Sequence, residues 1–271
     1  MTLPIGWDDA RTARAYERFC TRHPRYREAN DALAAHAALE PGQRVLDVAA
    51  GTGRTAEAVL PHIGTRGSVL SFEPARAMRD LGARRVRDPR VAWTGELPDA
   101  EAARFDRVVC SAGIWQMLPL HSALGKLAAL LAPGGALVFN IPAQYLLEPD
   151  QPGGGRDPLL LQLLSLVSYS APPRAQSDSR GGAEVALPRS SSEVDALLTT
   201  LGLRAERWSY ALRLTQEAYR DWLKLPPVSE GVFAGLPPAE REGRLDDAYR
   251  RVDRRSWRWE RWLGWTAWRA S

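Results

Sequence analysis

The sequence predicts an α/β fold of the doubly wound type, in which helices cover both faces of a parallel sheet. Short apolar runs without polar alternation recur through the first half of the chain, and a segment of helix length follows each of them. Strands buried on both faces have this pattern, because neither face meets water. In such sheets a ligand binds beyond the carboxyl ends of the strands. The loops after these runs are therefore the expected place of function.

The individual elements follow in chain order. Polar-faced helices occupy residues 1–42 and end at the turn Pro41-Gly42. Pro61 closes a later helix and Pro74 opens the next, because proline suits only the first turn of a helix. The expected strands are 45–48, 68–72, 90–94, 105–111, 135–140 and 203–214, and the expected helices are 54–60, 74–86, 121–131, 158–167, 192–201, 216–224 and 239–254, before an aromatic run at 257–268.

The region after residue 140 departs from the alternation of strands and helices. Residues 170–192 are rich in Ser, Pro, Gly and Arg, which is typical of a loop, either a mobile lid or a tolerated insertion. We expect a single domain over the 271 residues. Its expected parts are a helical cap (1–42), a cofactor-binding core (43–142), an insertion or lid (143–200) and the C-terminal strands and helices (201–271).

The composition is that of an ordinary globular protein. It is 45% hydrophobic and 25% charged, and its two cysteines, Cys20 and Cys110, exclude a disulfide scaffold and fit a reducing compartment. The formal charge is +4, but 32 acidic residues are interspersed among the 36 basic ones, so no basic stripe predicts nucleic-acid binding. The one long uncharged stretch, 127–147, is broken by Pro133-Gly134-Gly135 and is not a membrane span. No signal peptide is recognisable, and we expect a cytoplasmic protein, either a monomer or a homodimer.

The strongest chemical signal is the loop Ala49-Ala50-Gly51-Thr52-Gly53, which joins the first predicted strand to a helix. Glycines allow a ligand to approach the backbone, and the helix N-terminus attracts negative charge. Glu73 lies 20 residues beyond Gly53, at the end of the second strand, where a carboxylate binds ribose hydroxyls. Strand, loop, helix, strand and acid together indicate a cofactor that contains a nucleoside.

Two nucleoside cofactors fit this loop. Residues 51–56 match the dinucleotide fingerprint G-x-G-x-x-A, which favours NAD or FAD. Asp47 favours S-adenosylmethionine (SAM) instead, because a carboxylate inside an apolar strand suits a ligand with a cationic amine. The same carboxylate would also suit a contact with the helix N-terminus, so the residues alone leave both cofactors open.

Four segments resemble the motifs of class I SAM-dependent methyltransferases, in the family order and with the family spacing. They are 45–53 (VLDVAAGTG), 72–78 (FEPARAM), 105–111 (FDRVVCS) and 131–139 (LAPGGALVF). The segment 112–116 (AGIWQ) further resembles the small-molecule branch, the methyltransferase type 11-like enzymes that include the biotin-precursor carboxyl and trans-aconitate methyltransferases. The resemblance implies a Rossmann-like sheet of seven strands with the last one antiparallel, an insertion after strand five, and Trp259 to Trp268 on or near that last strand.

The resemblance also implies a cofactor, SAM with S-adenosylhomocysteine (SAH) as product, and roles for individual residues. Asp47 and the loop would hold the methionine part, Glu73 the ribose, and the segment after strand three the adenine. Ala49 replaces a family glycine, which is tolerable if its φ stays negative. The implied cofactor-binding residues are Asp47, Ala49, Ala50, Gly51, Gly53, Glu73, Pro74, Met78, Gly95, Glu96, Leu97 and Ser111.

The sequence assigns no catalytic residue. Methyl transfer is an in-line displacement that needs alignment at about 3 Å and exclusion of water. A general base is needed only when the acceptor arrives protonated. His121, which opens the helix after strand four, is the first candidate base, and His23, His36 and His62 are the others. Candidates for the acceptor pocket are Trp7, Tyr16, Trp115 and Tyr145, and no metal site is expected.

The function predicted is SAM-dependent methylation of a small molecule, on oxygen or nitrogen ahead of carbon. Arg-rich, Lys-poor composition and the insertion suit bacterial secondary metabolism, that is, natural product biosynthesis. Three alternatives stay open: a SAM-fold enzyme without methyl transfer, such as a cyclase; an NAD-dependent oxidoreductase; and a non-catalytic partner subunit that has kept the fold.

Overall fold

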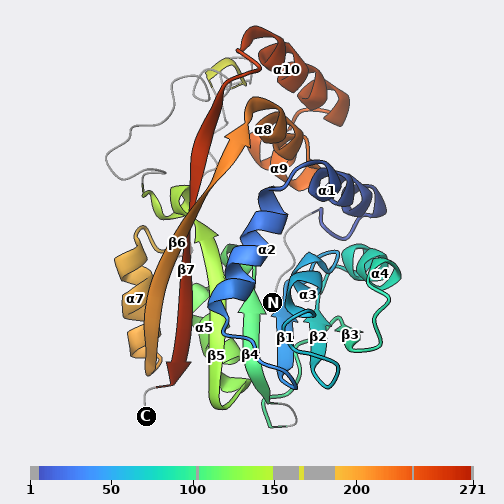
Figure 1. The fold of residues 1–271 in the computed structure, drawn as a ribbon. Coiled ribbons are helices and arrows are strands. Elements are labelled where there is room, and N and C mark those ends of the chain that lie inside the picture. The colour runs from blue at the N-terminus through green and yellow to red at the C-terminus, as the bar shows by residue number, and fades with distance from the viewer. Residues whose placement is uncertain (1–5, 102–103, 149–164, 168–186, 234, 270–271) are drawn as a thin grey trace.

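A seven-stranded sheet forms the centre of the computed structural model, which describes residues 6–101, 104–148, 165–167, 187–233 and 235–269 (Figure 1). The strands are β1 (Arg44–Val48), β2 (Ser68–Phe72), β3 (Val91–Thr94), β4 (Phe105–Cys110), β5 (Leu131–Pro142), β6 (Leu203–Thr215) and β7 (Trp257–Arg269). Their spatial order is β3-β2-β1-β4-β5-β7-β6. The pairs among β1 to β5 are parallel, and β7 is antiparallel to both β5 and β6. The expected doubly wound sheet with an antiparallel last strand is confirmed.

Helices cover both faces of this sheet. They are α1 (Ala10–Arg22), α2 (Arg25–His36), α3 (Arg54–Val59), α4 (Arg76–Arg85), α5 (Leu120–Ala129), α7 (Ser191–Thr200), α8 (Gln216–Leu223), α9 (Pro226–Val232) and α10 (Pro238–Arg251), with the short 3-10 turns η1 (Ile114–Gln116) and η2 (Ala143–Leu146). Val45 packs in a cluster with α2 and α3, whereas its neighbour Leu46 packs with α5 and α7. Successive strand residues point to opposite faces, so unbroken apolar strands require both layers.

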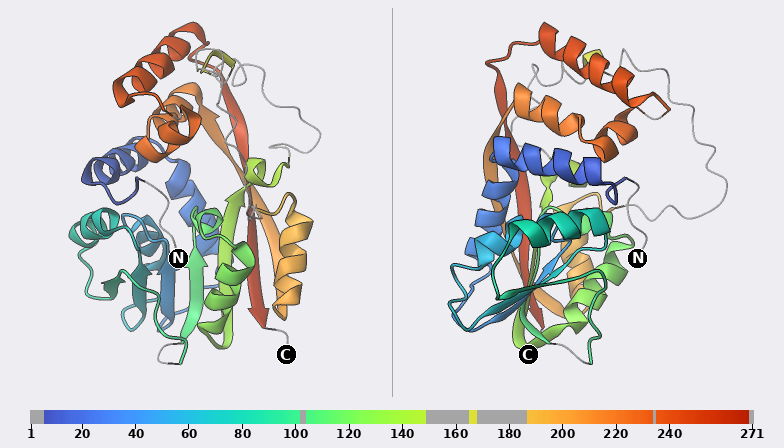
Figure 2. Two further views of the ribbon diagram at one scale, coloured as in Figure 1. Left: turned by 180° about the vertical axis from the view of Figure 1, so that it is seen from behind. Right: turned by 90° about the vertical axis from the view of Figure 1, so that its right-hand side faces the viewer.

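A cap lies over the carboxyl ends of the parallel strands (Figures 1 and 2). It consists of α1, the start of α2, and the helices α8, α9 and α10 that connect β6 to β7. β6 and β7 are 13 residues long and extend into the cap, where Leu212, Leu214 and Trp262 pack with its helices. The cap therefore has its own apolar core, separate from the two faces of the sheet.

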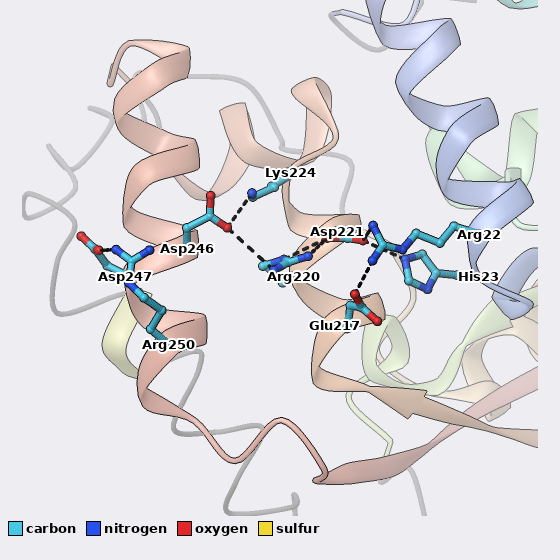
Figure 3. Close-up of polar contacts among 9 residues, drawn as sticks. All are labelled: Arg22, His23, Glu217, Arg220, Asp221, Lys224, Asp246, Asp247 and Arg250. Atoms are coloured by element: carbon cyan, nitrogen blue, oxygen red, sulfur yellow. Dashed lines mark hydrogen bonds and ion pairs between the residues drawn. The ribbon is translucent and has the colours of Figure 1, made fainter.

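Ion pairs join the helices of the cap to one another (Figure 3). At the end of α1, Arg22 pairs with Glu217, and the imidazole Nε2 of His23 lies 2.9 Å from Asp221 of α8. Lys224 Nζ lies 2.6 Å from Asp246 of α10. Burial raises the pKa of Asp221, but hydrogen bonds from His23 and Arg220 outweigh it, so the net pKa is lowered. The first helix of the chain is thus fixed to helices some 200 positions later.

The structure differs from the sequence-based expectations mainly in the cap. The helix α9 was not expected, because Pro226 and Pro227 indicate a turn; they occupy the first turn of the helix instead. The expected helix 158–167 and loop 170–192 lie outside the described residues, apart from a helical piece at 165–167 and the stretch that leads into α7. Within the described ranges, no helix is both long and apolar enough to cross a bilayer.

Candidate active site

A cavity of about 140 Å³ separates the strand ends from the cap. Its floor comes from α4 and the loops after β1, β2 and β4, and its roof from the turn at Trp7 and from α1, α2, η1, η2, α8 and α9. Ten of the residues predicted from the sequence are among those that line it. The lining residues are Trp7, Tyr16, Tyr26, Ala49, Gly51, Glu73, Pro74, Met78, Ser111, Ala112, Gly113, Trp115, Gln116, Met117, Tyr145, Trp222 and Val228.

The loop after β1 turns through three left-handed residues, Ala49 (φ +55°), Gly51 (φ +56°) and Gly53 (φ +85°). The condition that φ of Ala49 stays negative is not met, because the turn imposes the glycine conformation whichever residue is present. A Cβ on Gly113 would lie only 2.7 Å from the Cβ of Ala49. Alanine at position 49 therefore requires glycine at position 113.

The two glycines of this loop serve different purposes. A Cβ on Gly51 would lie 3.6 Å from Met78 and 3.8 Å from Tyr16, so the bare backbone there opens onto the cavity. A Cβ on Gly53 would meet Val86 at 2.8 Å and Trp93 at 3.0 Å. Gly53 therefore permits packing behind the loop, and neither it nor Ala50 lines the cavity.

Glu73 is buried at the floor of the cavity and is tied to the loop. Its Oε2 accepts the N–H of Gly51 at 2.8 Å, and its Oε1 accepts the N–H of Ala75 at 2.9 Å. Burial raises the pKa of Glu73, and the N–H groups of Ala75 and Gly51 offset only part of the rise. Each carboxylate oxygen keeps a second lone pair, which can accept a hydrogen bond from a ligand.

Asp47 lies in β1 beneath this floor and is completely buried. Neither carboxylate oxygen has a hydrogen-bond partner among the described residues, and Asp47 does not line the cavity. Burial, and then the charge of Glu73, raises the pKa of Asp47 well above its ordinary value. The site thus holds two carboxyl groups, and no Lys, Arg or His is among the described residues that line the cavity.

The segment predicted to edge the adenine does not reach the cavity. Gly95, Glu96 and Leu97 are absent from its lining, and a Cβ on Gly95 would meet the guanidinium of Arg79 at 2.8 Å. Arg79 also donates to the carbonyl of Glu73 at 2.6 Å, so it occupies the space between this segment and the floor. Pro74, Met78 and Ser111 do line the cavity, as placed by the sequence.

Asn140 was missed by sequence reasoning, although an amide inside an apolar strand is a detectable signal. It is fully buried in β5, and its Oδ1 accepts the N–H of Ala112 at 2.8 Å. Its Nδ2 donates to the carbonyl of Ala29 in α2 at 3.4 Å. Asn140 therefore fixes the loop after β4 and links it to the cap.

Aromatic side chains dominate the roof. The four predicted pocket residues all line it, and two pairs of them are in contact: Trp7 with Tyr16 at 5.7 Å between centroids, and Trp115 with Tyr145 at 5.1 Å. Tyr26 and Trp222 complete the roof and were not predicted. They lie on helices far apart in the sequence, and no local sequence pattern indicates that these helices are in contact.

No histidine lines this cavity among the residues described. His121 borders a separate surface groove with Arg189 and Glu193, which removes the geometric basis for its role as the base. The titratable groups that line the cavity are Glu73 and three tyrosines, and burial raises the pKa of each tyrosine. The described residues also include no cluster of three His, Cys, Asp or Glu side chains that could hold a metal ion.

Comparison with known proteins agrees with this geometry. A model of the methyltransferase domain matches residues 21–200. The ubiquinone/menaquinone biosynthesis C-methyltransferase UbiE of Coxiella burnetii (strain Dugway 5J108-111) is 32% identical over 108 residues, 37% of this chain and 43% of that protein. The chain thus matches less than half the length of this relative.

Two solved structures share the fold over nearly the whole chain. One is a SAM-dependent methyltransferase from Geobacter sulfurreducens in complex with SAH, with a TM-score of 0.51 at 17% identity over 94% of this chain and 96% of that one. The other is the putative methyltransferase in a complex with the Haloferax volcanii Trm112 methyltransferase activator, with a TM-score of 0.56 at 14% identity over 98% of both chains.

The residues present fit a SAM cofactor. A sulfonium and an ammonium would balance the two carboxyl groups, and Gly51 leaves room for a ligand against the loop. The family match extends over more than half of the chain and includes all four motifs found in the sequence. The chain therefore belongs to the methyltransferase domain family, with the class I fold and SAM as its cofactor.

Proposed function

We propose that this protein transfers the methyl group of SAM to a small planar molecule that binds beneath the aromatic roof. The observation that carries the proposal is the contrast within one cavity: an acidic floor with no cationic side chain among the described lining residues, and a roof of six aromatic side chains from separate elements. Aromatic faces stack on planar molecules and attract cations. A cationic cofactor and a planar acceptor fit these two surfaces.

The chain's own residues would hold SAM, which supplies an electrophilic methyl group on a sulfonium. The free lone pairs of Glu73 would accept hydrogen bonds from the ribose hydroxyls, and the backbone at Gly51 would allow close approach. Met78 would pack against the adenine, and Ser111 would lie beneath the sulfonium. Asp47 contributes its charge through the floor, since it does not line the cavity. These roles follow from the family resemblance together with the positions of the side chains.

The cavity favours an acceptor that is already nucleophilic at neutral pH. Both oxygens of Glu73 accept backbone hydrogen bonds, and the pKa values of the tyrosines are raised, so none of them suits removal of a proton from the acceptor. A protonated amine fits this cavity poorly. Of the two atoms expected from the sequence, oxygen and nitrogen, oxygen fits it well, and so does an electron-rich carbon, as in the relatives named C-methyltransferases. Its apolar walls exclude water from the reacting atoms.

The proposal is tested with methyl-labelled SAM and a panel of phenols, aromatic carboxylic acids and aromatic amines. We expect label in the products of carboxylic acids, or of phenols acidic enough to be ionised at neutral pH, and NMR of the product identifies the methylated atom. Tight SAM binding without label in any product would favour the alternative of a SAM-fold reaction without methyl transfer. Natural product biosynthesis, a cytoplasmic location and the oligomeric state stay predictions from the sequence.

A further inference from the structure

The hydroxyl oxygen of Tyr26 accepts hydrogen bonds from two side chains. Tyr26 lies in α2, lines the cavity and is 8% exposed. Its oxygen lies 3.1 Å from Nη1 of Arg25 and 3.2 Å from Nε1 of Trp222. Arginine and tryptophan side chains have no acceptor atoms, so both are donors to the Tyr26 oxygen.

These two contacts decide where the hydroxyl hydrogen can go. A phenolic oxygen accepts through two lone pairs and donates one hydrogen. With both lone pairs engaged, the hydrogen of Tyr26 is the only hydrogen-bonding capacity that remains. Among the described residues the Tyr26 hydroxyl donates no hydrogen bond, and the ring belongs to the wall of the cavity.

A buried ion pair prevents this arrangement from relaxing. Arg25 Nε and Nη2 donate to the two carboxylate oxygens of Glu260 in β7, at 2.8 and 2.7 Å, and both side chains are almost completely buried. The Arg25 guanidinium also lies 4.8 Å from the ring of Trp222 and 5.5 Å from that of Trp262. Arg25 therefore cannot turn away from Tyr26 without breaking a bidentate pair.

We propose that the Tyr26 hydroxyl donates a hydrogen bond into the cavity, to an oxygen atom of the methyl acceptor. This proposal rests on the proposed function and narrows its substrate class to molecules with a phenolate, carbonyl or carboxylate oxygen. Arg25 acts through Tyr26 as a positioning residue, because its positive charge behind the phenolic oxygen strengthens the O–H as a donor. Negative charge on the acceptor oxygen is thereby favoured beside the apolar rings.

The test compares two probes of nearly equal shape, 4-nitrophenol and 4-nitrotoluene, on protein saturated with SAH. We expect the wild type to bind 4-nitrophenol about tenfold more tightly than 4-nitrotoluene, which is the effect of one good hydrogen bond. Tyr26→Phe should lose this preference while its affinities for SAH and for 4-nitrotoluene stay the same. The control is Tyr249→Phe, which removes a hydroxyl from α10 outside the cavity and should keep the preference.

A second readout reports the hydrogen bond itself. Donation to the phenolate stabilises its charge, so the pKa of bound 4-nitrophenol, followed by visible absorbance, should be higher in Tyr26→Phe than in the wild type. Equal binding of the two probes by the wild type would overturn the proposal, whatever the fate of the variant. A preference that survives in Tyr26→Phe would also overturn it. Failure of SAH to bind the wild type would instead overturn the proposed function beneath it.

Discussion

The floor and the roof of the cavity handle buried charge in opposite ways. The floor holds Asp47 and Glu73, two buried carboxyl groups. The charge of Glu73 raises the pKa of Asp47, and no Lys, Arg or His is among the described residues that line the cavity beside them. The roof holds Arg25 and Glu260, a pair that neutralises itself through two hydrogen bonds. A positively charged ligand would balance the charge of the floor, whereas the charges of the roof balance each other without a ligand. The difference indicates that the cofactor supplies part of the electrostatics of the site.

The largest expected effect concerns the roof. Glu260→Ala leaves the Arg25 guanidinium buried without its partner, and we expect it to lower the free energy of unfolding by about 3–5 kcal/mol. Denaturant titration measures this change. The matched control is Glu217→Ala, which removes the partly exposed partner of Arg22 and should cost less than about 1 kcal/mol. Similar losses for the two variants would mean that the ion pair does not hold the roof.

The next effect concerns the floor. Glu73→Ala removes the buried acceptor expected to bind the ribose, so SAM binding should weaken by about 1.5–3 kcal/mol, the range for hydrogen bonds to a charged group. Calorimetric titration with SAM measures it. Asp80→Asn changes a half-exposed carboxylate of the neighbouring helix and should leave the affinity as it is. An unchanged affinity in Glu73→Ala would remove the ribose assignment.

Asp47→Asn should separate stability from binding. It removes a buried charge without hydrogen bonds, so the ligand-free protein should gain about 1–3 kcal/mol at neutral pH, while its affinity for SAM falls. The native pKa of Asp47 is raised, so the folded wild type holds its proton more tightly than the unfolded chain does. Its stability therefore declines as the pH rises from the ordinary carboxyl range through the native pKa.

The gain in Asp47→Asn should accordingly grow over that same range of pH. Unfolding of both proteins in denaturant, measured at several pH values without ligand, checks this. A variant that is less stable than the wild type at neutral pH would show that the Asp47 carboxylate is satisfied in the free protein.

The smallest effect concerns the strained turn of the floor. Ala49→Gly removes the strain of an alanine in the left-handed conformation but raises the conformational entropy of the unfolded chain. We expect a net increase of about 0.5–1 kcal/mol in the free energy of unfolding. Gly113→Ala should destabilise the protein, because its Cβ would lie 2.7 Å from that of Ala49. Gly113→Ala should lower the free energy of unfolding less in the Ala49→Gly background than in the wild type. Additive effects in this double-mutant cycle would exclude a contact between positions 49 and 113.

The floor could be predicted from the sequence because its residues belong to short, continuous motifs. Glu73 and Gly51 are set by the strand–loop–helix pattern, and the strand ends bring them together in any such sheet. The conformation of Ala49 was not predictable from its residue type, since the turn overrides the preference of alanine. Gly95, Glu96 and Leu97 were placed by family analogy, and the guanidinium of Arg79 stands in their way.

The roof was only partly predictable, for a physical reason. Trp115 and Tyr145 follow strands β4 and β5, so the sheet alone places them at the correct edge. Tyr26 and Trp222 line the cavity because the cap between β6 and β7 folds back onto α2, which depends on tertiary packing. The Arg25–Glu260 pair joins residues 235 positions apart, and neither residue signals the other in the sequence.

The most direct test of the whole account is calorimetric titration of the purified protein with SAM, SAH and NADH in parallel. The acidic floor, with no cationic side chain among its described lining residues, predicts binding of the two sulfur nucleosides in the micromolar range and no binding of NADH. Binding of NADH alone would contradict the interpretation of Asp47 and Glu73. Absence of binding by all three would contradict the claim that this cavity is a SAM site.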